Sequence, residues 1–418
     1  MEIIDKLKDH NLWMEFLAYK LSRGDLIKKD RDDLQRFIET KKYEDFIDKI
    51  EKDINLSIPK VLEINKNGIK KKRVVFSFGR EENYFLKMIA FCLKDYDHLF
   101  CDNLYSFRND TGVKKAIGRI ISSIDISNTY TYKVDIHDYF NSINANSILN
   151  IFKEKLPKER WLYVFFENML LNPYAQKDDN RISIKKGVMA GTPTAGFLAN
   201  LYLSEMDGYF MNDDAMYARY SDDIIVFSTS KEKINKYESE IKQFFREKEL
   251  EVNPLKEIRT IPGERVEFLG FAMSPKEINV SDMSITKIKA KIKRKTRALY
   301  RWKIRKNAGD ERTAKALIRF LNNKFYNNNI HGEITWCRWY FPLVTTDGKL
   351  KILDDYSVNC IRYLYTGKNN KKKYNLRYKT IKDMGFRSLV NSFWKYKKGR
   401  YEVIENEFCE PDDKNHVE

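Results

Sequence analysis

Tyr220, Ser221, Asp222 and Asp223 form a polar island inside an apolar stretch of the chain. Residues of high β-propensity flank this island on both sides, at 216–219 and 224–227. The pattern predicts two short strands joined by a tight hairpin, because apolar β-forming runs interrupted by a short polar pair are typical of strand–turn–strand units. The carboxylates of Asp222 and Asp223 are then expected at the hairpin tip.

Two adjacent carboxylates at an exposed tip repel each other unless a cation lies with them. A divalent metal is the usual solution, and Mg²⁺ prefers carboxylate oxygens together with substrate phosphates. The dipeptide alone is a weak signal, because Asp-Asp occurs six times in the chain. Only the pair that begins at Asp222 is framed by strand-like apolar runs, so this pair is the candidate metal site. A solvated turn is the alternative.

The chain is strongly basic. Its 418 residues include 77 Lys and Arg against 60 Asp and Glu, which gives a net charge of +17. Such an excess favours a polyanionic partner, and nucleic acid is the first candidate. A basic surface that only maintains solubility is the alternative. The length predicts two or three domains with one substantial core.

The compartment is predicted from the cysteines and from the apolar runs. The five cysteines show no metal-ligand spacing and fit reduced thiols of a cytosolic protein. No apolar run approaches the ~20 residues that a membrane span needs. The first residues lack a signal-peptide pattern. We therefore expect a cytoplasmic protein without membrane contact.

Periodicity predicts an alternation of helices and strands. The first 60 residues are helical in pattern, with Trp13, Phe16, Leu17 and Leu21 on one face. Strands are expected at 74–78, 132–136 and 266–271, and helices at 83–93 and 195–210. In the C-terminal third, apolar residues at helical spacing among many Lys and Arg predict a basic helix. Its apolar face is formed by Ile285, Ile288, Ile292, Leu299 and Trp302.

Asp135 lies at the C-terminal end of the strand predicted at 132–136. It is a candidate partner for the hairpin carboxylates. A strand-end Asp beside a hairpin-tip Asp pair would complete a three-carboxylate site. Two metal ions in such a site can activate an attacking 3′-oxygen and stabilise a leaving pyrophosphate. A helix N-cap after the strand is the alternative for Asp135.

Five motifs in order resemble those of reverse transcriptases, over about residues 60–395. The first is Asp135 with Phe140. The second runs from Lys186 through Gly191 to Pro193 and includes residues 199–203. The third is Tyr220-Ser221-Asp222-Asp223, the fourth is residues 250–256 ending on Lys256, and the fifth, residues 267–271, resembles a primer-grip hairpin. Residues 72–75 and 105–108 resemble fingers motifs of bacterial members, and residues 364–368 and 385–391 are similar to C-terminal segments of bacterial members.

The resemblance implies a role for each matched residue. Asp135 and Asp222 would hold two Mg²⁺ ions, for which Mn²⁺ could substitute, with the Ile136 carbonyl as a further ligand and Asp223 in support. Phe140 would lie under the incoming sugar and favour dNTPs over rNTPs. The remaining nucleotide-binding candidates are Lys72 and Arg73 at the triphosphate, Ala190 and Gly191 at the close approach to the nucleotide, and Lys256 as general acid.

The expected nucleic-acid contacts lie further along the chain. The primer-grip resemblance implies contacts from Phe268, Leu269 and Gly270. The basic helix 286–306 is expected to follow a phosphate backbone with Lys291, Arg294 and Lys295. Each residue also has a plain alternative: Phe140 in the core, Gly191 in a turn, Lys256 or Arg73 as a solvated charge, and the helix as a solvated basic face.

The sequence departs from the common family pattern at two places. Ala190 stands where many reverse transcriptases have Gln before the Gly of the second motif, which puts ordinary fidelity or dNTP affinity in doubt. Ala195-Gly196-Phe197 replaces the more usual Ser-Pro. The chain resembles most the bacterial defence-associated, "unknown group" reverse transcriptases, and class 2 among them. That resemblance implies anti-phage defence and a partner non-coding RNA.

The sequence therefore predicts an α+β right-hand polymerase with fingers, palm and a helical, basic thumb. We expect an N-terminal helical segment at 1–60, fingers at 61–130, palm at 131–275 with part of the fingers around 144–186, and thumb with C-terminal region at 276–418. The expected reaction is RNA-templated addition of dNTPs to an RNA or DNA primer. A non-templated or protein-primed polymerase of the abortive-infection type and an inactive RNA-binding palm protein are the alternatives. The oligomeric state is left open.

Overall fold

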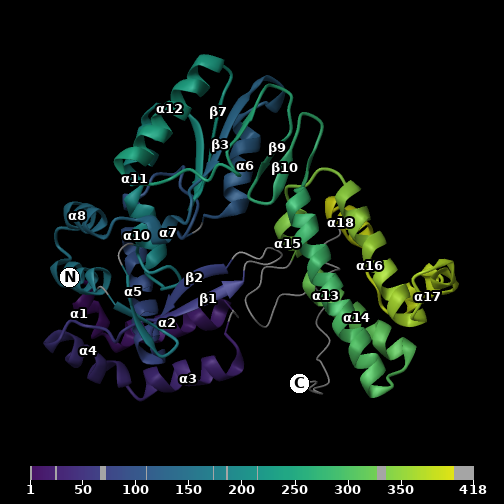
Figure 1. Ribbon diagram of the computed structural model, residues 1–418, viewed down its shortest axis with the longest axis horizontal. Coiled ribbons are helices and arrows are strands. Elements are labelled where there is room, and N and C mark those ends of the chain that lie inside the picture. Colours follow the sequence, from purple (N-terminus) through teal and green to yellow (C-terminus); the bar gives the residue numbers. More distant parts are fainter. Residues whose placement is uncertain are drawn as a thin grey trace. The chain divides into compact units, whose positions relative to one another are not determined.

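The chain forms two compact units that meet in the sequence between Leu269 and Gly270 (Figure 1). The computed structural model describes residues 2–23, 26–65, 72–109, 111–172, 174–184, 187–213, 215–326 and 336–399. Lys186, at the start of the second predicted motif, lies outside these residues. The predicted domain boundaries, including the palm–thumb boundary at 275/276, stay predictions.

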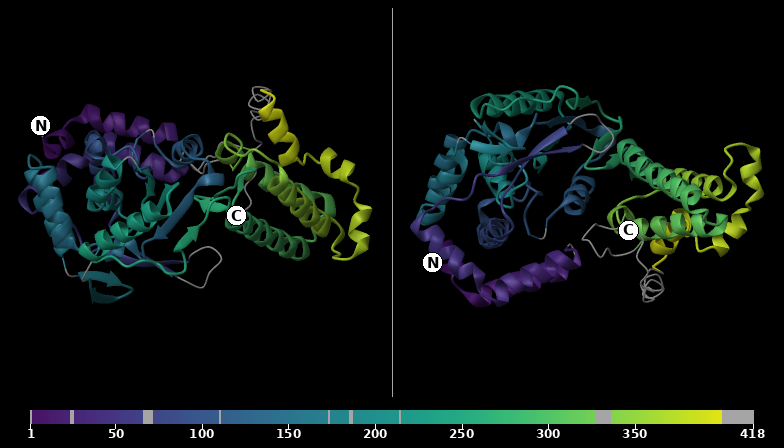
Figure 2. Two further views of the ribbon diagram at one scale, coloured as in Figure 1. Left: turned by 90° about the horizontal axis from the view of Figure 1, so that it is seen from above. Right: turned by 60° about the horizontal axis from the view of Figure 1, so that its bottom comes forward.

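Four helices form the N-terminal segment, drawn in purple in Figures 1 and 2: α1 (Ile3–Leu7), α2 (His10–Arg23), α3 (Lys28–Glu39) and α4 (Lys42–Lys52). Trp13 is fully buried and stacks on Tyr43 at 4.7 Å between ring centroids. Leu21 is 41% exposed, so it does not share the buried face that periodicity predicted for it. The segment belongs to the first unit, because the backbone N–H of Ile3 donates to the Glu159 carboxylate at 2.9 Å.

A four-stranded antiparallel sheet lies at the centre of the first unit. Its order is β6 (Met216–Tyr220), β7 (Asp223–Ser228), β3 (Tyr130–Asp135) and β8 (Ile258–Thr260). The register pairs Tyr220 with Asp223 across the hairpin, and Asp135 with Asp223 across β3 and β7. The predicted hairpin is thus confirmed, with Ser221 and Asp222 as its two-residue turn.

Helices cover one face of this sheet. Residues alternate between faces along a strand, so Tyr217 and Arg219 of β6 point to the same side. That side packs against α11 (Ser204–Asn212) and α12 (Lys231–Glu247), where Phe210 stacks on Tyr217 at 4.5 Å and contacts Tyr237 (Figure 1). Asp135 and Asp223 are directly opposite each other in the register of β3 and β7, so their carboxylates lie on the same face of the sheet.

A helix predicted to run unbroken from 195 to 210 is divided in the structure. α10 (Ala195–Tyr202) ends before Leu203, and α11 begins at Ser204. The Ser204 hydroxyl donates to the Leu201 carbonyl at 2.8 Å. Serine favours helix ends because its side chain competes for backbone hydrogen bonds. The sequence signal for the break was therefore present but was outweighed by the apolar periodicity.

A second sheet has the order β2 (Lys72–Ser77), β1 (Lys60–Asn65), β4 (Tyr174–Lys177) and β5 (Asn180–Ser183). The loop of the second motif joins it, because the N–H of Phe76 donates to the Ala190 carbonyl at 2.7 Å. The remaining helices of the first unit are α5 (Arg80–Cys92), α6 (Val113–Ser123), α7 (Tyr139–Ser142), α8 (Ala145–Lys155) and α9 (Arg160–Leu171). Short 3₁₀ turns cover Leu93–Leu99 and Ile126–Asn128.

The strand predicted over 266–271 is a strand, a tight turn and the start of another strand. β9 (Val266–Phe268) closes the first unit, and β10 (Phe271–Met273) opens the second. Leu269 and Gly270 both have a positive φ, of 47° and 88°, which ends an extended strand. Because periodicity detects only alternation of side chains, it did not show this turn.

The second unit is mostly helical. After β11 (Ile278–Val280) come α13 (Asp282–Lys306), α14 (Asp310–Phe325), α15 (Trp336–Tyr340), α16 (Gly348–Thr366), α17 (Tyr378–Asp383) and α18 (Leu389–Lys397), with a 3₁₀ turn at Lys371–Asn375. α13, α14 and α16 pack on one another. Ile285, Ile288 and Ile292 are buried as predicted. Leu299 and Trp302 are only half-buried, so the apolar face of α13 weakens toward its C-terminal end.

Candidate active site

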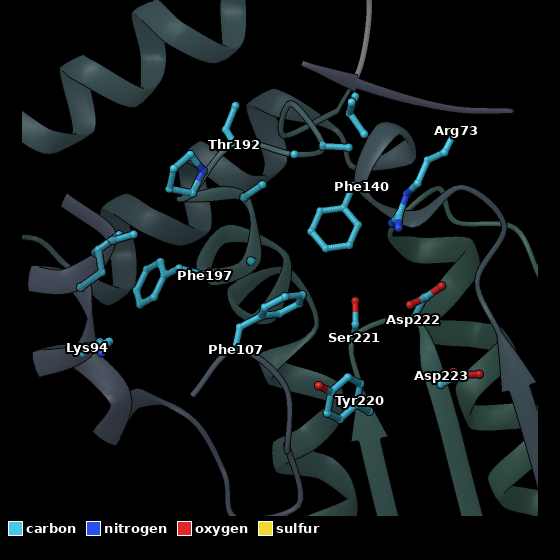
Figure 3. A pocket seen from close by; sticks show the side chains of 18 of the residues that line it. Arg73, Lys94, Phe107, Phe140, Thr192, Phe197, Tyr220, Ser221, Asp222 and Asp223 are labelled. Atoms are coloured by element: carbon cyan, nitrogen blue, oxygen red, sulfur yellow. The ribbon is translucent and has the colours of Figure 1, made fainter. Parts of the chain in front are cut away.

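The structure brings the three predicted acidic residues to one end of the sheet. Asp135 and Asp223 are directly paired in the register of β3 and β7. Asp222 lies in the turn, and its carbonyl accepts the N–H of Ile136 at 3.1 Å. Figure 3 shows Ser221, Asp222 and Asp223 along one wall of a cavity. Residues separated by almost ninety positions in the chain are thus neighbours because the sheet is antiparallel.

The carboxylate of Asp135 is held by two side chains of the fourth motif. Its Oδ1 accepts a hydrogen bond from Asn253 Nδ2 at 3.0 Å, and its Oδ2 forms an ion pair with Lys256 Nζ. The backbone also joins, since the N–H of Asn253 donates to the Asp135 carbonyl at 2.8 Å. Lys256 is therefore beside the acidic residues, and its role as general acid stays a prediction. Asn253 is a site residue to which the sequence analysis gave no role.

The surroundings of Asp222 disfavour its ionised form. Burial, together with the negative charges of Asp223 and Asp135, raises the pKa of Asp222 to about 6 from its ordinary value of 3.8. Desolvation and like charge both disfavour the ionised form, whereas a cation would favour it. The tip is therefore less exposed than the sequence suggested, and its negative charge is incompletely compensated by Lys256.

The donor chemistry of this cluster fits Mg²⁺. Carboxylate oxygens are the ligands that hard divalent cations prefer. Within the described parts of the chain, no three His, Cys, Asp or Glu side chains are already gathered at metal-binding separations. The ammonium group of Lys256 lies against one oxygen of Asp135, so a metal bound by Asp135 would compete with this ion pair.

Two cavities adjoin the acidic residues. One has a volume of about 500 Å³ and is lined by the hairpin, by the loop around Gly191 and by Phe107 and Phe140 (Figure 3). The other, of about 420 Å³, is lined by Asp135, Asp222 and Lys256. Arg73 and Phe140 line both cavities. The guanidinium carbon of Arg73 lies 5.9 Å from the centre of the Phe140 ring, which is a cation–π distance.

Lys72 and Arg73 differ in their contacts although both line the second cavity. The Lys72 ammonium group lies 2.6 Å from Glu63 Oε2, and Lys177 lies 2.6 Å from the other oxygen of Glu63. The charge of Lys72 is thus already compensated within the sheet formed by β1 and β2. Arg73 is consequently the stronger of the two candidates for contact with an anionic substrate.

Gly191 has a structural reason to be glycine. Its φ is +98°, and a Cβ atom there would lie 2.9 Å from the Cβ of Val75. The close approach that we predicted toward a nucleotide is made in the structure to strand β2. Contact with a nucleotide stays a prediction for Gly191, which lines the larger cavity, and for the buried Ala190.

Phe107 is a cavity residue that the sequence analysis placed in a motif without giving it a role. Its side chain is 59% exposed, its φ is +54°, and its ring meets Phe140 edge-on at 6.0 Å. A positive φ is uncommon for a bulky residue. An exposed aromatic within a matched motif was the signal that could have identified it.

The predicted nucleic-acid contacts lie in both units. Phe268 is buried with Lys133 near its ring, and Leu269 lines the larger cavity. Gly270 belongs to the second unit, where a Cβ atom would lie 3.0 Å from the Tyr340 hydroxyl. On α13, Arg294 and Lys295 are exposed and Lys291 is half-buried. Their contact with nucleic acid stays a prediction.

No helix in the described part of the chain combines the length and the apolar character that crossing a membrane requires.

Comparisons with known proteins agree with the motif order. Residues 64–273, half of the chain, match the family described as reverse transcriptase (RNA-dependent DNA polymerase). Retron Ec86 reverse transcriptase of Escherichia coli is 24% identical over 172 residues, which cover 40% of this chain and 49% of that protein. The chain thus spans about half the length of this curated relative.

Solved telomerase structures are also similar to this chain. Apo telomerase of Candida tropicalis has a TM-score of 0.46 at 12% identity, covering 84% of this chain and 69% of that one. Telomerase of Candida albicans with a fragment of telomeric RNA has a TM-score of 0.44 at 11% identity, covering 88% and 69%. The family match, with the mixed helices and strands, confirms the predicted α+β, right-hand polymerase class. From the ordered motifs, the clustered carboxylates and this match, we conclude that the chain belongs to the reverse transcriptase family.

Proposed function

We propose that this protein is an RNA-directed DNA polymerase that adds dNTPs to a primer 3′-hydroxyl. The observation that carries the proposal is the register of Asp135 with Asp223, which places both beside Asp222. This acidic cluster opens on cavities that Arg73 and Phe140 also line. An anionic metal site and a cation for phosphate are parts that nucleotide addition needs, and a ring beside them would add discrimination between sugars.

Asp135 and Asp222 would hold two Mg²⁺ ions, with Asp223 and the Ile136 carbonyl in support, and Mn²⁺ as a substitute. Such ions supply neutralisation of the triphosphate and activation of the attacking oxygen. Lys256 already lies against Asp135. Its ammonium group also lines the cavity that Arg73 lines, and there it would serve as the general acid that protonates the leaving pyrophosphate.

The chain's own residues would orient the substrate. Arg73 would contact the triphosphate, because guanidinium groups bind phosphate oxygens with two parallel hydrogen bonds. The Phe140 ring, held between Arg73 and Phe107, would lie under the sugar and exclude a 2′-hydroxyl. We assign the sheet of β6, β7, β3 and β8 to the palm and the helices of the second unit to the thumb.

We further propose that the template is a structured non-coding RNA and that the protein acts in anti-phage defence. The net charge of +17 supports binding to RNA but gives no selectivity. The resemblance to class 2 defence-associated enzymes supports a neighbouring non-coding RNA as template. The similar Escherichia coli protein is a retron reverse transcriptase, which fits a bacterial enzyme of this general kind.

Sequencing of the RNA and DNA bound to the protein purified from its native host tests the proposal. We expect one dominant RNA, together with cDNA complementary to it, and we expect the Asp222→Asn variant to retain the RNA but lack the cDNA. Bound DNA without a complementary RNA would instead support a non-templated or protein-primed polymerase. RNA spread over abundant transcripts, without cDNA in either protein, would leave only an RNA-binding protein.

A further inference from the structure

A short segment that leads into the matched motif at 105–108 supports the hairpin. The N–H of Arg219 donates to the Asn103 carbonyl at 2.9 Å, and the N–H of Tyr105 donates to the Arg219 carbonyl at 2.9 Å. Leu104 and Arg219 thereby form a parallel bridge. Residues 103–105 thus extend the sheet at the β6 edge. The next residue, Ser106, thereby lies against the backbone of the turn.

The Ser106 hydroxyl connects the turn to helix α10. It accepts the N–H of Ser221 at 2.8 Å and donates to Asn200 Oδ1 at 3.1 Å. Asn200 Nδ2 returns a hydrogen bond to the Ser106 carbonyl at 2.7 Å. Both side chains are fully buried. We call these two residues the Ser106–Asn200 clamp.

A buried ion pair contacts both Asn200 of the clamp and Ser221 of the turn. Arg219 and Asp207 pair with one another, and Arg219 is completely buried. Arg219 also donates to the Asn200 carbonyl at 3.0 Å and reaches the Ser221 carbonyl at 3.4 Å. Buried ion pairs seldom add net stability, because desolvation offsets their attraction. This pair is therefore better explained by the geometry that it fixes in Asn200 and Ser221.

The turn needs such support. Ser221 has a φ of +60°, whereas two-residue hairpin turns with a positive φ at this position prefer glycine. A non-glycine residue in the left-handed region is strained and persists only where its surroundings hold it. Asp222 follows directly in the chain, so the direction of its carboxylate depends on the conformation of Ser221.

We propose that Ser106 and Asn200 are positioning residues of the polymerase site. By holding the backbone of Ser221, the clamp sets the position of the Asp222 carboxylate relative to Asp135 and so the metal affinity of the site. This inference rests on the proposed function, and it adds residues from outside the hairpin and the Asp135 motif. It also couples the second motif, through α10, to the third.

Removal of the Ser106 hydroxyl leaves the N–H of Ser221 buried without its partner, and the strained turn is expected to relax. Displacement of a reacting group by about 1 Å can cost on the order of 10²-fold in rate. We therefore expect Ser106→Ala to lower kcat by about 10- to 100-fold. The KM for dNTP should change by less than about threefold, because Arg73 and Phe140 come from other elements and stay in place.

The test combines kinetics with direct metal binding. Primer-extension kinetics are measured for wild type, Ser106→Ala, the near-isosteric Ser106→Cys, Asn200→Ala and the double variant. Binding of Mn²⁺ to each purified protein is measured by electron paramagnetic resonance, without substrate. Ser228→Ala is the matched control, because its hydroxyl also accepts a backbone N–H, from Ser230 at 3.1 Å, but at the opposite end of β7.

We expect Ser106→Ala and Asn200→Ala each to weaken Mn²⁺ binding by about tenfold or more, with Ser106→Cys intermediate. The double variant should be no worse than the worse single variant, because residues that act as one unit are not additive. Ser228→Ala should match wild type in both measurements.

Wild-type kcat and Mn²⁺ affinity in folded Ser106→Cys and Asn200→Ala would overturn the inference, as would additive losses that follow thermal stability. If wild type binds Mn²⁺ but incorporates no nucleotide, the proposed function fails. The clamp is then judged by the Mn²⁺ affinities alone.

Discussion

At the residue scale, the three carboxylates of the acidic cluster differ in how far a neighbouring positive charge compensates them. Asp135 is paired with Lys256, whereas Asp222 is largely buried beside two other carboxylates, and its pKa is raised to about 6. In the unfolded chain the group would titrate near its ordinary value of 3.8. The folded state therefore holds this proton more tightly, and ionisation of Asp222 lowers stability as pH rises between these two values.

We predict that Asp222→Asn abolishes dNTP incorporation without destabilising the protein. At about pH 7.5 and without divalent metal, the free energy of unfolding should be unchanged or higher by about 1–2 kcal/mol, because the repelled charge is gone. The gain should shrink as pH falls toward about 4, where the wild-type carboxyl is protonated in the native state. Urea denaturation with a metal chelator at several pH values measures this.

Asp135→Asn is the informative comparison, because this change also ends an ion pair with Lys256. It should abolish activity equally, with a smaller gain in stability. Full polymerase activity in either variant with Mg²⁺ as the only metal would remove these residues from the catalytic site.

We predict that Phe140→Ala or Phe140→Val relaxes sugar selection. The ring lies between Arg73 and Phe107 at the cavity, so its loss opens space for a 2′-hydroxyl. The ratio of rNTP to dNTP incorporation should rise by about tenfold or more. Phe197→Ala is the matched control, because Phe197 lines the same cavity but packs on Phe100. If the ratio of rNTP to dNTP incorporation is the same in wild type and in the two Phe140 variants, Phe140 is a packing residue only.

Single residues also show what the sequence could not reveal. The proximity of Asp135, Asp222 and Asp223 was predictable, because the resemblance to ordered motifs implies one shared site. The reason for Gly191 was not, because its constraint is Val75, on a strand more than a hundred positions away. Ser106 and Asn200 carry no charge and no periodic pattern. Their hydrogen bonds exist only once the fold has brought them together.

At the element scale, strands and helices with a strong pattern were predicted and their ends were not. Strands β6 and β7 form on the two sides of the turn, as expected, and their central residues are buried. The division of the predicted helix 195–210 at Leu203 and the turn at Leu269 and Gly270 depend on local backbone angles. Such angles respond to tertiary packing, which a count of apolar positions does not include.

Helix α13 supports a prediction about binding to RNA. Its buried face is formed by Ile285, Ile288 and Ile292, while Arg294 and Lys295 are exposed. Changing Lys291, Arg294 and Lys295 to Ala should weaken RNA binding and reduce the magnitude of the slope of log K against log[salt]. Each lost phosphate contact should account for about 0.7–0.9 of that slope.

The control for this helix changes net charge equally. Lys231, Lys233 and Lys236 are exposed on α12, so their triple Ala variant removes three charges from the first unit. Salt slopes that fall equally in the two triple variants would mean that α13 contributes only general charge.

At the scale of the whole molecule, basic charge gathers near the C-terminal end. Residues 362–399 contain twelve Lys and Arg but only one acidic residue, Asp383. Exposed aromatic rings accompany this charge, with Tyr374 54% and Trp394 44% exposed. Arg362 lies 4.9 Å from the centre of the Tyr374 ring. Aromatic rings with adjacent cations are suited to stacking on unpaired bases of structured RNA.

We predict that Tyr374→Ala weakens binding of the native partner RNA by about 1–3 kcal/mol, that is, by roughly five- to 150-fold. Binding of an unstructured RNA of equal length should change little. Tyr174→Ala is the matched control, because Tyr174 is also exposed and lies 3.6 Å from Arg181, but in the first unit. Equal losses for both RNAs in a gel-shift titration would show that Tyr374 does not select structure.

The charge, the motif order and the α+β class were all accessible from the sequence, because each is carried by residues near in sequence or by composition. The division into two compact units between Leu269 and Gly270 depends on tertiary contacts, which a sequence pattern does not contain. The identity of the partner RNA is carried by neither the fold nor the motifs, so it has to be measured.

The most direct test of the central claim is single-nucleotide primer extension by the purified protein on four RNA templates that differ in the next base. We expect wild type, with Mg²⁺, to add the complementary dNTP in each case, and Asp135→Asn and Asp222→Asn to add none. Addition of the same nucleotide whatever the template base, or undiminished addition by either variant, would contradict the claim that Asp135, Asp222 and Asp223 catalyse RNA-directed DNA synthesis.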